Sequence, residues 1–358
     1  MQNPYAGKPD HQFWRRSVTG RASDGVDPVV HTGFTLTRDA RVATAGSCFA
    51  QHVARTLRET GFNYLITETG PAHGFSGTEN YGVFSARYGN IYTVRQLLQL
   101  FRRAYGLFQP EDSAWRRSDG RYVDPFRPYI HEAGFASPEE VEAERESHLD
   151  AVRRLFEDSD AFVFTLGLTE AWERLSDGAV FPLAPGVVGA EVKPEDYGFH
   201  NFTVAEMEAD LGEVLKRLHR INPACRVLLT VSPVALIATY EDSHVLTANT
   251  YSKSALRVVA GQLAQAFDFV DYFPSYEIIL GPHAGASFLA PDLREVTTEG
   301  VACAMAIFAS HYLSEDERGT SRPVGKDVPD VDDIARQRAF MAEIASVICD
   351  EENIDTPS

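Results

Sequence analysis

The chain has 358 residues, and its 33 Lys and Arg residues against 51 Asp and Glu residues give a formal net charge of −18. Nucleic acids and anionic membrane surfaces bind clusters of cations, so this charge balance argues against both as partners. The hydrophobic fraction of 44% and the charged fraction of 23% are typical of a folded globular protein with one large domain or two of modest size.

Targeting and cofactor signals are missing from the sequence. The longest apolar run, residues 301–309, is far shorter than the roughly 20 residues of a membrane helix, and the polar N-terminus does not resemble a secretory signal. The cysteines form no Cys-x-x-Cys pair, no Gly-rich phosphate loop follows a strand, and no His/Cys/Asp cluster has metal spacing. We therefore expect a cytoplasmic protein with free thiols, no cofactor, no metal and no membrane insertion.

Three regions differ in composition. Residues 1–35 alternate between polar and aromatic without a sustained period, and we expect an N-terminal arm packed on the domain. Residues 36–313 are expected to form one α/β domain. Residues 314–358 begin as an acidic, Pro-containing linker, and a peripheral helix is expected after it, with an apolar face of Ile334, Phe340, Met341, Ile344 and Val347.

Within the domain, apolar strands alternate with helices. A short strand at residues 42–45 stops at Gly46, and the following helix ends near Gly61. Ser137 and Thr203 each begin a helix as the first residue of a capping box, with Glu140 and Glu206 as the partners. Further strands are expected at residues 161–168, 226–231 and 267–272, with helices at about 252–267 and around residues 301–308. This alternation predicts a parallel sheet covered by helices on both faces.

In such sheets, functional residues gather at the carboxyl ends of the strands. The first strand is followed by Gly46, Ser47 and Cys48, directly before a helix. Free N–H groups at a helix start lower the pKa of a thiol and can stabilise an oxyanion, so Ser47 and Cys48 are candidate nucleophiles. The alternative is that Ser47 caps the helix and Cys48 is a buried core residue.

Several strings together resemble the bacterial GSCFA-domain family, which is itself similar to SGNH/GDSL-type hydrolases. The resemblance covers roughly residues 3 to 312. It is carried by AGSCFA at 45–50, preceded by NPY and FWRR, and by YGVFSARYGNIYT, FVFTLGLTEAW, VSPV, HVLTANTYSKSALR and YFPSYEI. The resemblance implies a flavodoxin-like, three-layer α/β fold of the SGNH-hydrolase type.

The resemblance also implies roles for residues at three strand ends. Cys48 falls at the position of the SGNH nucleophile, and Ser47 remains the alternative. The oxyanion-hole and substrate-binding positions fall on Gly167, Thr169 and Glu170, and on a loop that contains Gly89 and Asn90. The simpler interpretations are that Glu170 is an acid at a helix start and that Asn90 forms a turn.

The last SGNH element, Asp-x-x-His, matches Asp292 but has Glu295 in place of the histidine. Either another histidine supplies the imidazole, or Glu295 is the base, or the site has lost its hydrolytic chemistry. Among the histidines we rank His244 first and then His200 and His283, whereas His52 and His219 are interpreted as surface or packing residues. Ser252, Lys253 and Arg257 near a helix start are interpreted as a cap with solvated charges or as a grip for an anionic group.

These residues predict an SGNH-like esterase or acyltransferase with a small-molecule or carbohydrate ester as its partner. The nucleophile would attack an O-acyl group of a carbohydrate or small metabolite. The alternative is a non-catalytic relative that keeps the pocket for ligand binding and has lost the Asp-x-x-His dyad.

Overall fold

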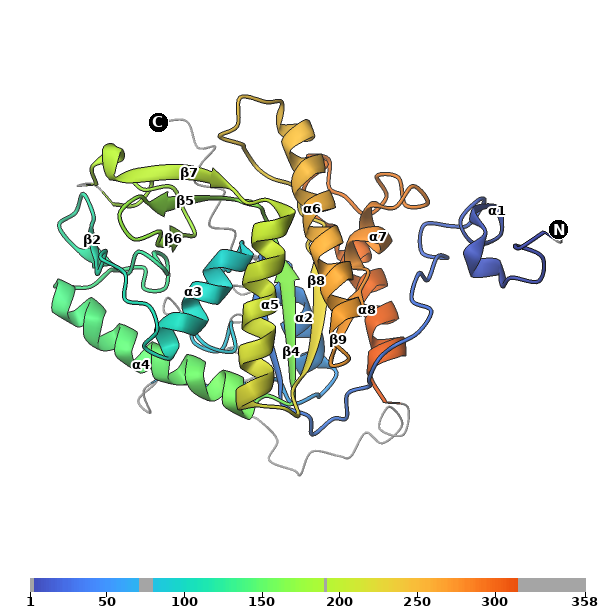
Figure 1. Ribbon diagram of the computed structural model, residues 1–358, viewed down its shortest axis with the longest axis horizontal. Helices are drawn as coiled ribbons and strands as arrows, with labels where there is room; N and C mark the ends of the chain where they lie inside the picture. Colours follow the sequence, from blue (N-terminus) through green and yellow to red (C-terminus); the bar gives the residue numbers. More distant parts are fainter. Residues whose placement is uncertain (1–2, 71–79, 190–191, 315–358) are drawn as a thin grey trace, which may run out of the picture.

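The computed structural model describes residues 3–70, 80–189 and 192–314. At its centre lies a four-stranded sheet in the order β1-β4-β8-β9, made of β1 (Val42–Gly46), β4 (Ala161–Leu166), β8 (Arg226–Val231) and β9 (Val270–Phe273). All neighbouring strands pair in parallel, and β1 and β4 are buried along their whole length (Figure 1). The parallel sheet predicted from the apolar runs is confirmed.

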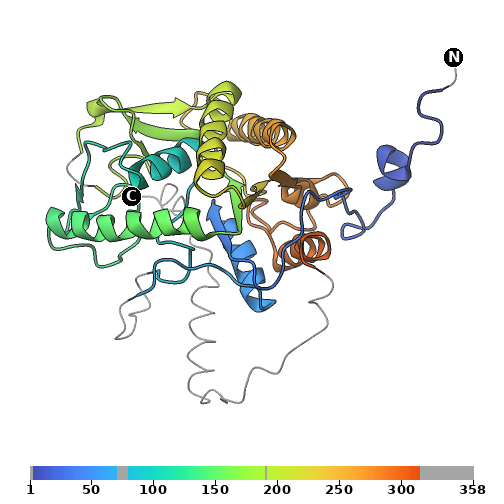
Figure 2. The same cartoon turned by 60° about the horizontal axis from the view of Figure 1, so that its bottom comes forward.

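Helices cover both faces of this sheet. Strand residues such as Ala43, Phe162 and Leu229 point into one apolar core, which is closed by α3 (Val94–Ala104), α4 (Pro138–Asp158), α5 (Val204–Ile221) and α6 (Val245–Ala266). Alternate residues such as Val42 and Val163 point into a second core under α2 (Ala50–Glu59), α7 (Ser275–Leu280) and α8 (Thr298–Tyr312). The result is the expected three-layer, flavodoxin-like arrangement (Figures 1 and 2).

Two small sheets were not predicted. Strands β5 (Glu170–Arg174), β6 (Val180–Phe181) and β7 (Tyr197–Asn201) form an antiparallel sheet in the order β6-β5-β7, and the short helix η2 (Pro194–Asp196) precedes β7. A hairpin of β2 (Trp115–Arg116) and β3 (Tyr122–Val123) packs against the same sheet through a shared apolar cluster. The β5–β7 sheet lies above the upper end of β4, so it borders the carboxyl edge of the central sheet (Figure 1).

The helix starts follow local side-chain chemistry. Thr203 and Glu206 form a complete capping box, as predicted. Ser137 accepts a hydrogen bond from the Glu140 N–H, but the Glu140 carboxylate binds the Ala136 N–H, so that box is incomplete. Helix α6 begins at Val245, earlier than the sequence pattern indicated, because His244 caps it.

The N-terminal segment contacts the domain through its later residues, 27–36. Its helices η1 (Asp10–Gln12) and α1 (Trp14–Ser17) contain no buried residue, and Figure 1 shows α1 set apart from the sheet. Closer to the domain, Leu36 forms a parallel bridge with Leu313, and His311 contacts Asp27 at 2.6 Å. The linker and the helix predicted beyond Ser314 lie outside the described residues. Over residues 3–70, 80–189 and 192–314, none of the helices is both long enough and apolar enough to cross a bilayer.

Candidate functional site

The turn between β1 and α2 depends on a glycine. Gly46 has φ of +137°, a conformation that side-chain-bearing residues rarely adopt. A Cβ atom at Gly46 would lie 2.7 Å from the backbone nitrogen and 2.8 Å from the Cβ of Thr165 on β4. The Ser47 N–H then donates to Thr165 O at 3.1 Å, and α2 starts at Ala50. The sharp bend predicted at residues 46–48 is confirmed.

Both candidate nucleophiles on this turn are buried. Ser47 is 3% exposed and Cys48 is 4% exposed. The N-cap of α2 is Phe49, without a side-chain cap, so Ser47 does not cap the helix. The buried Ser47 hydroxyl has no hydrogen-bond partner within the described residues. A buried hydroxyl without a partner costs about 1–3 kcal/mol, and in native structures it usually indicates a water, a ligand or a catalytic role.

The structure brings two other predicted segments to this turn. Gly167, after β4, packs so closely on Ser47 that a Cβ at Gly167 would lie 2.9 Å from the Ser47 Cβ. The Ile91 N–H donates to Gly46 O at 2.8 Å, and the neighbouring Asn90 side chain accepts a hydrogen bond from Gln51 of α2 at 3.2 Å. The Gly46–Cys48 turn, the Gly89–Asn90 loop and Gly167 therefore meet at the carboxyl end of the sheet.

Several expected oxyanion donors are already occupied. The N–H groups of Gly167 and Leu168 both donate to Tyr92 O, at 3.1 and 2.9 Å. The Thr169 N–H donates to Ser252 Oγ at 3.2 Å, and the Thr169 hydroxyl donates to Asn201 at 2.7 Å. In the segment after β4, these groups therefore hold the backbone in place. Beside the nucleophiles, the Phe49 N–H makes no hydrogen bond to another described residue.

A lysine is buried behind the same segment. Lys253 of α6 has no exposed surface, and its ammonium group donates to Gly167 O at 2.8 Å. From the sequence, Lys253 was interpreted either as a solvated charge near a helix cap or as a residue that binds an anionic group. The solvated alternative is wrong. Because Gly167 contacts Ser47, the Lys253 side chain anchors the segment that packs against the turn.

The acid–base residues expected from Asp-x-x-His and from the histidine ranking make local contacts. Asp292 and Glu295 are exposed, and the Asp292 carboxylate accepts the N–H groups of Arg294 and Glu295 in its own loop. His244 is exposed, and its Nδ1 accepts the Leu246 N–H as the cap of α6. The described contacts do not link these three side chains to the Gly46–Cys48 turn.

The other imidazoles differ in their environment. His200 contacts Glu206 at 3.0 Å and Glu173 at 3.4 Å, so it belongs to the small sheet. Burial lowers the pKa of His283, and its Nε2 is buried without a partner among the described residues. Burial, with a smaller effect of Arg55, lowers the pKa of His52 to about 4, and its Nδ1 is likewise buried without a described partner. His52 is therefore neutral at neutral pH, the form that accepts a proton.

The sequence interpretation treated His52 as a surface or packing residue and gave it no role in the site. The structure bears out the packing alternative for His52. The side chain packs against the Phe49 ring, with 5.4 Å between the ring centroids.

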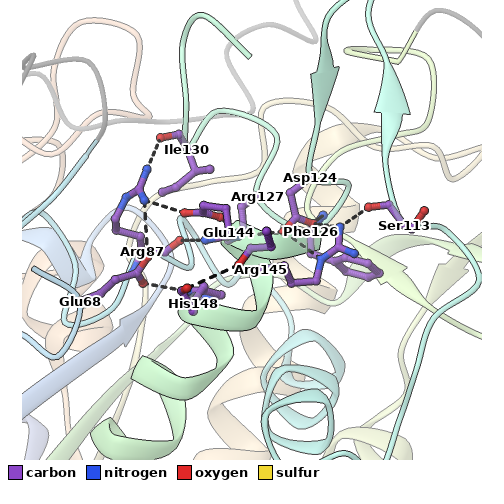
Figure 3. A network of polar contacts seen from close by, with 12 residues as sticks. Glu68, Arg87, Ser113, Asp124, Phe126, Arg127, Ile130, Glu144, Arg145 and His148 are labelled. Carbon is purple, nitrogen blue, oxygen red and sulfur yellow. Dashed lines mark hydrogen bonds and ion pairs between the residues drawn. The ribbon is translucent and has the colours of Figure 1, made fainter. Parts of the chain in front are cut away.

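A buried ionic network supports the Gly89–Asn90 loop (Figure 3). The fully buried Asp124 accepts hydrogen bonds from Arg127 and Arg145, and Arg127 also contacts Glu144. Arg127 Nη1 donates to Arg87 O at 3.3 Å, which fixes the backbone three residues before Asn90. The network therefore stabilises the backbone next to the Gly89–Asn90 loop.

The outer part of the network centres on Glu68. Its carboxylate accepts the Arg87 N–H and contacts His148, both at 2.7 Å. Burial alone would raise the pKa of Glu68, but His148 and Arg127 outweigh it and lower the pKa to about 2. Glu68 is therefore ionised at neutral pH and completes the charge balance around the arginines.

A pocket of about 250 Å³ opens beside the strand ends. Its walls come from the β5–β7 sheet and from the loop after β8, and Leu168, the residue after Gly167, is one of them. Pro182 lines this pocket and also a smaller hollow that Gly89 and Asn90 line. The pocket and the predicted site therefore share neighbouring walls.

The described part of the chain contains no group of three or more His, Cys, Asp or Glu side chains arranged to hold a metal ion.

Two other cysteines provide a comparison for Cys48. Burial raises the pKa of Cys225 to about 11 and also raises the pKa of Cys303. These two thiols are therefore protonated at neutral pH and serve as internal references for Cys48.

The fold and the strand-end site define a class: a three-layer α/β protein whose candidate site is built from loops at the carboxyl edge of a parallel sheet. Within that class, the sequence profile of the GSCFA family matches residues 41–308, from β1 into α8. The chain belongs to the GSCFA family. A search of curated proteins finds no match to it.

Proposed function

We propose that the chain is an enzyme acting on ester bonds, an esterase or acyltransferase that attacks an O-acyl group of a carbohydrate or small metabolite. One observation supports it most. Two nucleophile-capable side chains, Ser47 and Cys48, stand on a glycine-dependent turn against which Gly167 and the Asn90 loop pack. The resemblance to SGNH-type hydrolases supports the same reaction class.

In this proposal the nucleophile adds to the acyl carbonyl carbon, and the ester C–O bond then breaks. The alcohol leaves with a proton, and water or a second alcohol later attacks the acyl-enzyme to restore the free side chain. The Phe49 N–H and the Asn90 side chain are the candidate donors to the oxyanion. The base stays unassigned in this proposal, because His244 and Glu295 make local contacts and the low pKa of His52 makes its ring a weak base at neutral pH.

A ligand-binding protein without catalysis is the second candidate. The low exposure of Ser47 and Cys48, 3% and 4%, restricts the approach of a substrate. Asp292 is held within its own loop, and the residue three positions later is Glu295 and not a histidine. A pocket kept for binding would need neither an exposed nucleophile nor a dyad.

The acyl-enzyme can be tested with p-nitrophenyl acetate. We expect a burst of one p-nitrophenolate per protein, which Cys48→Ala abolishes if the thiol is the nucleophile and Ser47→Ala abolishes if the hydroxyl is. Cys303→Ala, which removes a partly buried thiol of α8, is the matched control and should keep the burst. The proposal fails if wild type gives no burst or if both Cys48→Ala and Ser47→Ala retain it.

Thiol reactivity gives a second, independent measurement. If Cys48 is the nucleophile, iodoacetamide should modify it at least tenfold faster than Cys225 and Cys303, because burial raises the pKa of the two reference thiols. Peptide mapping after timed alkylation distinguishes the sites. A Cys48 rate no higher than that of Cys225 would leave Ser47 as the only candidate nucleophile.

A further inference from the structure

The pocket beside the strand ends has an aromatic wall. Trp172 of β5 pairs directly with Phe181 of β6 and with Phe199 of β7, so the three rings lie in one row across the small sheet. All three line the pocket. Tyr240 packs on Trp172, with 4.7 Å between ring centroids, and on Phe199 at 5.3 Å. This row gives the pocket a broad apolar surface.

The opposite wall is the loop after β8, which is tied to the small sheet through Glu170. This carboxylate accepts hydrogen bonds from the Thr239 hydroxyl at 2.7 Å and from the Tyr240 N–H at 3.3 Å. Leu236 and Ile237 of the loop face the pocket, and the Leu236 N–H is held by Asn249 of α6 at 3.1 Å. Both walls are therefore fixed by hydrogen bonds before any ligand binds.

The charge of the pocket selects against anions. Glu170 is the one charged side chain among the described lining residues, and burial raises its pKa because its ionised form is poorly solvated. The formal net charge of the whole chain, −18, also disfavours the binding of an anion. A ligand with a carboxylate or phosphate in this pocket would meet like charge, whereas an uncharged apolar group would meet mostly hydrocarbon and aromatic rings.

The size of the pocket limits the ligand. An apolar cavity of about 150 Å³ accepts the six carbons of benzene. By proportion, a pocket of about 250 Å³ has room for an apolar group of roughly eight to ten carbons. This is too small for a helix or a strand of a partner protein, and it matches the acyl chain of a medium-length ester.

The geometry points to an acyl-chain subsite: we propose that this pocket binds the uncharged apolar acyl chain, of about eight to ten carbons, of the ester substrate. The inference rests on the proposed function. Leu168 joins the pocket wall directly to Gly167, and Gly167 contacts Ser47, so a chain in the pocket would bring its carbonyl end toward the turn.

The pocket can be tested without catalysis, in the full chain carrying Ser47→Ala and Cys48→Ala. The probes are the uncharged alcohols 1-butanol, 1-hexanol and 1-octanol, with Trp172 fluorescence as the readout. We expect the dissociation constant to fall about fourfold for each added methylene group, the gain expected when each one leaves water. Octanoate, of similar length but charged, should bind at least tenfold more weakly than 1-octanol.

Three variants locate the binding. Ala238→Phe places a ring at an exposed position of the pocket wall and should weaken 1-octanol binding at least tenfold, whereas Ala209→Phe, at an exposed position of α5, should leave it unchanged. Glu170→Gln should narrow the gap between octanoate and 1-octanol. The inference is overturned if affinity does not rise with chain length, or if Ala238→Phe and Ala209→Phe bind 1-octanol equally well.

The failures of the two proposals can be distinguished. Binding of 1-octanol that depends on Ala238, with no burst from p-nitrophenyl acetate or p-nitrophenyl octanoate in wild type, would support the apolar pocket and refute the ester chemistry. A burst on acetate without any chain-length dependence of alcohol binding would support the ester chemistry and overturn the acyl-chain subsite.

Discussion

Replacing Gly46 by alanine tests whether the turn at the site depends on the missing side chain. The new methyl group would lie 2.7–2.8 Å from Thr165 atoms of β4, including its backbone nitrogen, which cannot rotate away. Strain at φ of +137° costs about 1–3 kcal/mol, and the forced separation of packed atoms costs about another 1–3 kcal/mol. We therefore expect Gly46→Ala to lower the free energy of unfolding by about 3–5 kcal/mol.

Gly212→Ala is the matched control. Gly212 lies inside α5, and the nearest atom to an added Cβ there is Cδ2 of Leu263 at 3.8 Å, an ordinary contact. Helix propensity then predicts a gain of about 0.5–1 kcal/mol. Urea unfolding followed by circular dichroism measures both changes. The reasoning is refuted if Gly46→Ala unfolds within about 1 kcal/mol of wild type.

Two further changes test the charges inside the protein. Asp124→Asn removes the negative charge that pairs with the buried guanidinium groups of Arg127 and Arg145. It should lower the free energy of unfolding, measured in urea, by about 3–5 kcal/mol. The exposed control Asp150→Asn should cost under about 1 kcal/mol, and equal effects would contradict this reasoning. The pKa of His52 falls from 6.5 to about 4 on folding. The contribution of His52 to the free energy of unfolding is therefore fully present above pH 6.5, and up to about 3 kcal/mol of it is lost as the pH falls toward 4. His52→Gln should flatten the stability profile in that window, and an unchanged profile would show that His52 is not responsible.

Three strands of the central sheet were predictable because they are mostly apolar and buried, whereas β9, which contains Asp271, was predicted at residues 267–272 and spans Val270–Phe273. β1, β4 and β8 occur where the sequence placed them, and the helix at Thr203 starts at its capping box. The β5–β7 sheet was not predictable, since β5 (EAWER) and β7 (YGFHN) are half-buried strands without an apolar run. Of the two interpretations of Glu170, a substrate-binding residue or an acid at a helix start, the second is wrong, because Glu170 begins a strand.

The site could be predicted only in part. The Gly46–Cys48 turn, Asn90 and Gly167 follow from strand ends and from the family resemblance, and they do come together in space. The burial of Lys253 and of His52 could not be predicted, because it depends on tertiary packing that the neighbouring residues do not reveal. Lys253 reaches Gly167 across 86 positions of the chain, a contact that only the packing of α6 on the sheet creates.

The bridge between Leu36 and Leu313 has a practical consequence for protein engineering. The Leu36 N–H donates to Tyr312 O at 2.6 Å, and the Ser314 N–H donates back to Leu36 O at 3.1 Å, so entry and exit of the segment lie side by side. The segment from Leu36 to Ser314 could therefore be inserted into a surface loop of a host protein, because its two ends are adjacent.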